Sequence, residues 1–309
     1  MKKVLNYAGL AFFIMAVVAI YSQLSRYSWE DIRAAVMAVS GKSMLLAVLA
    51  CTAGYAVLAC YDWLALKYIG RRLAAWKWLL VGFLGFAISN NAGTAVVSGG
   101  AIRYRLYTRW KFRMAEIVKM VTFSGFTYLV GCLCLVSIGY FMVPDNMRET
   151  PAVALAFPPC FASFVAYFAL AKWYKKGIRI AGETFKMPSV KMAAAQSALG
   201  TMDSLCASLV LYSVLYPFVP VPFDVYVGVF VISQVLGVFT PVPGALGVFE
   251  GLFMLLLPGA KGNEAAVFGA LIVYRVIYYL IPLALAGLVM MFGPAYVRYH
   301  RRRRHRNKS

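Results

Sequence analysis

The sequence predicts an all-α polytopic membrane protein with six full crossings and two re-entrant helical hairpins, arranged as an inverted-topology repeat. Three observations lead to this fold class. Apolar residues make up 62% of the 309 residues and charged residues only 14%, whereas soluble domains are about 45–50% apolar. The mean hydropathy is +0.74. The basic residues collect in a few short loops. A soluble enzyme and a secreted disulfide scaffold are therefore excluded.

Eight apolar stretches supply the elements of this fold. About 20 helical residues cross the hydrocarbon layer, and most of the stretches reach this length. They cover residues 4–22, 43–66, 78–100, 120–143, 151–171, 192–216, 225–257 and 265–292. The first stretch follows Lys2 and Lys3 like a signal peptide, but it has no clear small-residue cleavage site and is predicted to be an uncleaved crossing.

Loop charges set the predicted topology. The loops 67–77, 101–119 and 172–191 carry net charges of +4, +5 and +5, and the tail 293–309 carries +7. Cytoplasmic loops of membrane proteins are enriched in lysine and arginine, so all four segments are predicted to be cytoplasmic. The stretch between the first two loops must then enter and return on the same face. We therefore predict a multi-pass protein with both termini in the cytoplasm.

Both predicted hairpins contain breaks in their apolar pattern. Residues 89–94 read Ser-Asn-Asn-Ala-Gly-Thr, and residues 240–244 read Thr-Pro-Val-Pro-Gly. Broken backbone is tolerated at membrane depth only where it lines a protein-enclosed or wet cavity. The 225–257 stretch is flanked by weakly charged loops and is too long for one straight span, which predicts a hairpin that enters from the outer face.

The two halves of the chain repeat the same order of elements upside down. Residues 1–147 form the first repeat with the hairpin 78–100, and residues 148–309 form the second repeat with the hairpin 225–257 and the basic tail 293–309. Paired broken helices in inverted repeats are typical of alternating-access transporters. The alternative is eight plain helices with two glycine-rich kinks.

Glu250 is a candidate for chemistry in the second hairpin. It follows Gly244 by six residues, and Gly244, Gly247 and Gly251 leave one helix face nearly bare. A bare face lets another helix or a head group approach the backbone, and a helix N-terminus favours a phosphate or carboxylate. Glu250 would accept an amine or a proton, or pair with an arginine for structural reasons.

Arg275 lies eleven residues into the last apolar stretch. An arginine at that depth costs at least about 2.5–3.5 kcal/mol on insertion scales, so it should face a partner or water. Tyr278 and Tyr279 are placed to stack on it or bond to it. Its guanidinium is suited to grip a phosphate. The structural alternative is an ion pair with Glu250 or Asp203.

Arginines also follow the first break. Arg103, Arg105 and Arg109 come directly after Ser98-Gly99-Gly100. Glycine-rich backbone beside arginines indicates a phosphate cradle, and the alternative is positive-inside anchoring.

Each half of the chain has one acidic residue in its second crossing. Asp62 is close to the cytoplasmic end and is expected to pair with Lys67 or a nearby arginine. Asp203 lies deep enough to serve in a proton relay or an ion pair.

The remaining residues narrow the chemistry. Both histidines, His300 and His305, lie in the terminal tail, and the six cysteines show no C-x-x-C spacing. No nucleotide-binding fingerprint is present. We therefore predict no cofactor, no metal and no catalytic residue. The polybasic tail indicates either contact with anionic lipid or a topology anchor.

Three segments carry a resemblance to a known family. They are Gly99-Gly100-Ala101-Ile102-Arg103-Tyr104-Arg105-Leu106-Tyr107, Pro243-Gly244-Ala245-Leu246-Gly247-Val248-Phe249-Glu250 and Tyr274-Arg275-Val276-Ile277-Tyr278-Tyr279. With them the sequence resembles the transmembrane domain of lysylphosphatidylglycerol synthase/flippase proteins, in particular the stand-alone YbhN-like inner-membrane branch, over essentially the whole chain. Ala245 stands where the family commonly has glycine.

The resemblance implies lipid translocation or trafficking across a bacterial cytoplasmic (inner) membrane. Longer relatives carry a soluble aminoacyl-transferase domain, which is not expected here, so the chain is predicted not to be an enzyme. The leading hypothesis is a flippase for a phospholipid with an anionic or aminoacylated head group. The alternatives are a non-transporting partner or scaffold of a lipid-synthesis enzyme, and an ion-coupled solute carrier.

The expected partners are membrane phospholipids, with a lipid-synthesis enzyme or a second copy of the chain as further candidates; nucleic acid is not expected. The residues expected to bind the cargo are Gly99, Gly100, Arg103, Arg105, Asp203, Pro243, Gly244, Gly247, Glu250, Tyr274, Arg275 and Tyr278.

Overall fold

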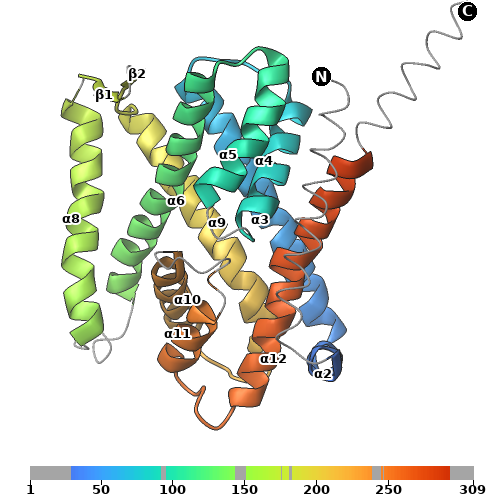
Figure 1. Ribbon diagram of the computed structural model, residues 1–309. Helices are drawn as coiled ribbons and strands as arrows, with labels where there is room; N and C mark the ends of the chain where they lie inside the picture. Colours follow the sequence, from blue (N-terminus) through green and yellow to red (C-terminus); the bar gives the residue numbers. More distant parts are fainter. Residues whose placement is uncertain are drawn as a thin grey trace, which may run out of the picture.

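The computed structural model describes residues 29–91, 95–142, 151–174, 176–180, 183–238, 245 and 247–292. Within this part the protein is almost entirely helical (Figure 1). Four helices are long and apolar enough to cross a membrane, and they cover Gly41–Tyr68, Met114–Phe141, Val190–Leu215 and Glu264–Phe292. The predicted first crossing, residues 4–22, lies outside the described residues.

The first half of the chain contains five helices and a single 3-10 turn within the described residues. They are α2 (Trp29–Ala38), α3 (Gly41–Tyr68), α4 (Ala75–Ser89), α5 (Ala95–Tyr107), the 3-10 turn η1 (Thr108–Trp110) and α6 (Met114–Met142). Ser40 caps α3 because its hydroxyl accepts a hydrogen bond from the Ser43 amide. Helix α2 lies between the apolar stretches 4–22 and 43–66, where no element is predicted.

The second half begins with α8 (Pro151–Trp173), which is followed by a short antiparallel pair of strands, β1 (Ile178–Ile180) and β2 (Glu183–Phe185). Helices α9 (Val190–Leu215), α10 (Phe223–Val238) and α11 (Val248–Leu256) follow. The last long helix is α12 (Glu264–Tyr274), which continues through the π-helical turn η3 (Arg275–Leu280) to Phe292. The strands were not predicted, because they are too short to show an alternating apolar pattern within the strongly charged segment 172–191.

Helices α3 and α9 pack against each other at the centre of the molecule, and α6 packs beside α9 (Figure 1). Close contact between α6 and α9 depends on Gly131 and Gly200. A Cβ built on Gly131 would lie 2.2 Å from the carbonyl carbon of Gly200. Membrane helices commonly use small residues to approach so closely.

Helices α4 and α5 run antiparallel, and the start of α4 meets the end of α5. Arg71, just before α4, donates a hydrogen bond to the carbonyl of Lys111 at 3.2 Å. The rings of Trp76 and Trp110 meet edge to face. The connections α3–α4 and α5–α6 therefore lie at one end of the molecule, together with β1 and β2 (Figure 1).

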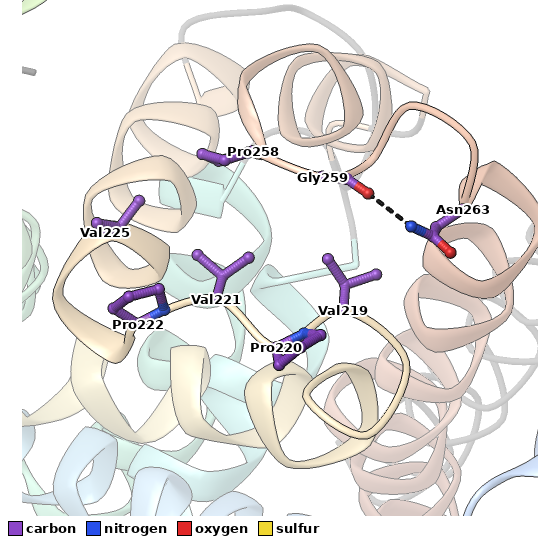
Figure 2. Close-up of a pocket in the computed structure, with 8 residues that line it drawn as sticks. All are labelled: Val219, Pro220, Val221, Pro222, Val225, Pro258, Gly259 and Asn263. Carbon is purple, nitrogen blue, oxygen red and sulfur yellow. Dashed lines mark hydrogen bonds between the residues drawn. The ribbon is translucent and has the colours of Figure 1, made fainter.

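Helices α10 and α11 form a second antiparallel pair at the opposite end. The start of α10 and the end of α11 border a shared hollow (Figure 2), and the ring of Tyr226 on α10 contacts Phe253 on α11. The connections α9–α10 and α11–α12 both lie at this end (Figure 1).

Candidate functional site

A buried ion pair ties α5 to α3. The Arg103 Nε lies 2.8 Å from Oδ1 of Asp62, and Asp62 has no exposed surface. The Tyr107 hydroxyl donates to the other carboxylate oxygen at 3.3 Å. The guanidinium carbon of Arg103 lies 4.6 Å from the centre of the Phe86 ring, a cation–π distance. Asp62 therefore pairs with an arginine, one of the partners expected from the sequence.

Gly99 makes room for this arginine. A Cβ on Gly99 would lie 3.1 Å from Nη1 of Arg103, and the Gly99 carbonyl accepts from the same atom at 3.5 Å. Gly100 faces open space. Arg105, two residues after Arg103, is half-buried and lies outside the Asp62–Arg103 pair.

A second buried ion pair ties α11 to the π-helical turn. The Arg275 Nε donates to Oε1 of Glu250 at 2.6 Å, and Nη2 lies 2.5 Å from the same oxygen. Both residues are buried. The guanidinium carbon lies 4.9 Å from the centre of the Tyr279 ring. Of the two expected partners for Arg275, the structure selects Glu250.

Glu250 also lies in the first turn of its own helix, α11, and binds the backbone there. Its Oε2 accepts a hydrogen bond from the Gly247 amide at 2.8 Å, so the carboxylate satisfies a backbone donor at the start of α11. Gly247 has a φ of +81°, a conformation that glycine adopts without strain. Pro243 and Gly244, which precede this cap, lie outside the described residues.

The π-helical turn holds Arg275 and joins the two halves of the chain. A π turn has i→i+5 hydrogen bonds in place of the i→i+4 bonds of an α-helix, and such turns are frequent at functional sites. Three side chains from the first half donate to carbonyls of this turn. Cys51 and Tyr55 of α3 donate to the carbonyls of Ile277 and Tyr278 at 3.3 and 3.1 Å, and Asn91, at the end of α4, donates to that of Tyr279 at 3.3 Å.

Asp203 lies between the two ion pairs, on α9. Its Oδ2 accepts from the Tyr61 hydroxyl at 3.1 Å, and its Oδ1 accepts from the Tyr278 hydroxyl at 3.5 Å. Tyr278 stacks on Tyr274 with ring centres 5.5 Å apart. The expected residues Asp203, Tyr274, Arg275 and Tyr278 are thus close together.

Several polar partners were not predicted from the sequence. Tyr61 and Tyr107 bind the two buried aspartates, and Tyr55, Cys51 and Asn91 bind the π turn. The signal that could have found Tyr61 is its position directly beside Asp62 in an otherwise apolar stretch.

An apolar hollow of about 420 Å³ opens at the end of the molecule opposite the strands. It lies between the α9–α10 connection and the α11–α12 connection, where Asn263 donates to the Gly259 carbonyl at 3.0 Å (Figure 2). None of the predicted site residues that the structure describes lines it. Its lining residues are Val219, Pro220, Val221, Pro222, Val225, Pro258, Gly259 and Asn263.

Comparison with known proteins identifies the family. The model of the lysylphosphatidylglycerol synthase transmembrane region matches residues 6–286. The uncharacterized protein slr0712 of Synechocystis is 34% identical, with 97% of this chain and 94% of the relative covered. The inner membrane protein YbhN of Escherichia coli is 29% identical, with coverages of 92% and 90%.

A phosphatidylglycerol lysyltransferase of Staphylococcus xylosus is 24% identical over 92% of this chain, which spans 33% of that enzyme. The similarity therefore runs through nearly all of the chain and includes a bacterial inner membrane protein. The chain belongs to the lysylphosphatidylglycerol synthase transmembrane-region family.

Proposed function

We propose that the protein is a lipid translocase of the bacterial inner membrane, which moves a phospholipid with an anionic or aminoacylated head group between leaflets. The observation that carries this proposal is the pair of buried ion pairs. Each ties the returning arm of a short helical pair to a long helix. Buried ionisable residues in a membrane protein mark substrate or ion pathways.

The proposed topology has six crossings and two re-entrant hairpins, α4–α5 from the cytoplasm and α10–α11 from outside, in repeats 1–147 and 148–309. Helix α8 has 23 residues, enough to cross the hydrocarbon layer. The three basic loops among the described residues lie at one end (Figure 1). Trp76, Trp110 and Lys77 cluster there, as expected at a cytoplasmic interface.

In this mechanism the head group enters between the hairpins while the acyl chains stay in the bilayer. The phosphate is received near Arg103 and Arg105, and it then replaces Glu250 on Arg275. Arginine binds phosphate and carboxylate in the same forked geometry, so the two anions compete for one guanidinium. Release of Arg275 frees α11 to move.

The relatives connect the family with the bacterial inner membrane and with phospholipid. Two of them are covered over at least 90% of their length, and one of these is an inner membrane protein. A third relative is by name a phosphatidylglycerol lysyltransferase. Phosphatidylglycerol, free or aminoacylated, is therefore the first cargo to test.

The test is translocation in proteoliposomes. Fluorescent phosphatidylglycerol, lysylphosphatidylglycerol, phosphatidylethanolamine and phosphatidylcholine would be compared by their protection from a membrane-impermeant quencher. We expect head-group-selective movement by the wild type, and its loss in Arg275→Ala and Glu250→Gln. Arg72→Ala, which removes an exposed arginine from the α3–α4 connection, is the control and should keep wild-type activity.

If folded wild-type protein moves none of these lipids, the proposal fails and a non-transporting partner of a lipid-synthesis enzyme becomes the better reading. If Arg275→Ala moves lipid at the wild-type rate, the role given to Arg275 is wrong.

A further inference from the structure

Asp203 is a buried carboxylate whose two hydrogen-bond partners among the described residues are both tyrosine hydroxyls. It is 5% exposed, in the middle of α9, and it accepts from Tyr61 and Tyr278. No basic side chain among the described residues lies within ion-pair distance of it. The other buried acids of this region, Asp62 and Glu250, each have an arginine. Asp203 therefore differs from them, because no cation among the described residues balances the charge of its ionised form.

Among the described residues, the titratable groups that interact with Asp203 are tyrosines and cysteines. Helices α8 and α10, which also pack on α9, place Tyr167 and Tyr226 elsewhere, at Gln196 and Ser208. Tyrosine and cysteine are ordinarily uncharged near neutral pH. The groups that interact with Asp203 are Tyr55 and Tyr61 of α3, Tyr128 and Cys132 of α6, Cys206 of α9 itself, and Tyr278 and Tyr279 of the π turn.

The two tyrosines connect Asp203 to both ion pairs. Tyr61 is the neighbour of Asp62, which holds α5. Tyr278 lies one turn after Arg275, in the same π turn that holds α11. A change at the Asp203 carboxylate therefore acts on the backbone segments that position both pairs.

We propose that Asp203 is a proton-binding site that couples proton movement to the motion of the two hairpins. This inference rests on the proposed lipid transport. The ionised carboxylate accepts one hydrogen bond on each oxygen. Uptake of a proton gives a neutral carboxylic acid, and the oxygen that carries the proton becomes a donor.

In the proposed step the new O–H of Asp203 donates to the hydroxyl of Tyr61 or Tyr278, and the hydrogen of that tyrosine turns to another acceptor. Either α3 or the π turn then shifts, and Asp62 or Arg275 shifts with it. Release of the proton on the other side of the membrane restores the starting hydrogen bonds, so that one proton is taken up and one is lost in each cycle.

The first test detects protonation of the Asp203 carboxylate and does not depend on lipid transport. Infrared difference spectra of the purified protein, recorded between acid and alkaline pH, should show a carboxylic-acid band that is absent in Asp203→Asn. Asp224→Asn, which removes a carboxylate at the outer start of α10, is the matched control and should keep the band. Spectra of Asp203→Asn identical to the wild type would overturn the proposal, whatever the cargo.

The second test measures whether a pH difference across the membrane drives lipid movement. Proteoliposomes with an imposed pH difference would be compared with liposomes without one. For one proton per lipid, each pH unit supports at most about a tenfold asymmetry of the cargo between leaflets. We expect the wild type and Asp224→Asn to build this asymmetry, and Asp203→Asn to equilibrate lipid without it.

The two proposals fail in different ways. Lipid movement by the wild type that ignores the pH difference would overturn proton coupling and leave the translocase standing. Lack of any lipid movement, with the Asp203 band present, would overturn the translocase and leave the proton-binding site. Tyr278→Phe provides a second variant: it keeps the carboxylate, and we expect a weakened asymmetry.

Discussion

Replacement of Gly131 by alanine should separate α6 from α9. A Cβ at position 131 would lie 2.2 Å from the carbonyl carbon and 2.3 Å from Cα of Gly200. Both atoms belong to the backbone of α9, so no side-chain rotation can make room. The gap must open to at least 3.4 Å, where ordinary van der Waals contact begins.

The expected cost follows from this displacement. A gap of about 1 Å between packed surfaces already forfeits up to half of the dispersion energy of the atoms that line it. Overpacking of this kind typically costs about 1–3 kcal/mol of unfolding free energy. Alanine also gains up to about 1 kcal/mol in helix propensity over glycine, which offsets part of the loss.

Gly125 gives a matched control on the same helix. Nothing lies within 4 Å of a Cβ at this position, so Gly125→Ala receives the same propensity gain without the clash. Because that gain cancels in the comparison, Gly131→Ala should be less stable than Gly125→Ala by about 1–3 kcal/mol. The assay is denaturant unfolding in detergent micelles. Equal stability of the two variants would refute the close packing of α6 and α9.

Three further outcomes are expected in the same unfolding assay. Asp62→Asn leaves Arg103 as an unbalanced buried charge and should cost about 3–5 kcal/mol, whereas Glu116→Gln, at a partly exposed pair, should stay within about 1 kcal/mol of the wild type. Tyr55→Phe removes one hydrogen bond to the π turn and should cost about 0.6 kcal/mol, the average for such bonds in membranes. Gln196→Leu removes the amide that donates to the Thr127 hydroxyl and the Phe123 carbonyl. It should cost more unfolding free energy than Tyr55→Phe, and a smaller cost would contradict the buried hydrogen bonds of Gln196.

Much of the fold could be predicted because the physics of the bilayer is simple. Long apolar stretches give the long helices, and loop charge places their ends. The basic loops 67–77 and 101–119 predict a stretch that returns on the same face of the membrane. The start of α4 and the end of α5 lie together, and the re-entrant topology stays a prediction. The β1–β2 pair and α2 were missed, because short elements in polar segments have no periodic pattern long enough to read.

The site could be predicted in part. Few charges lie inside the apolar stretches, so each had few available partners, and Arg275 was expected to pair with Glu250 or Asp203. The sequence could not choose between them, because the choice depends on how α11 packs against the π turn. The π turn itself could not be predicted, because two of its carbonyls accept hydrogen bonds from Cys51 and Tyr55, more than 200 residues earlier in the chain.

The two ion pairs share a feature that bears on transport. Every charged group in them keeps a second contact that is not ionic. Asp62 accepts from the Tyr107 hydroxyl, which lies on α5 like Arg103, and Glu250 accepts from the amide of Gly247 at the start of its own helix. Arg103 and Arg275 each retain an aromatic ring.

Removal of one partner from a buried ion pair is costly because the remaining charge is left without any compensation. In this protein, separation of the Glu250–Arg275 pair leaves Glu250 with the Gly247 amide and Arg275 with the Tyr279 ring, so the cost of opening falls below that of a buried pair without such contacts. A phosphate that replaces Glu250 on Arg275 offsets the remaining cost on the arginine. Asp62 has no such contact on its own helix, because Tyr107 moves with Arg103. In the proposed cycle the Glu250–Arg275 pair is therefore the one that a head group opens at the lower cost.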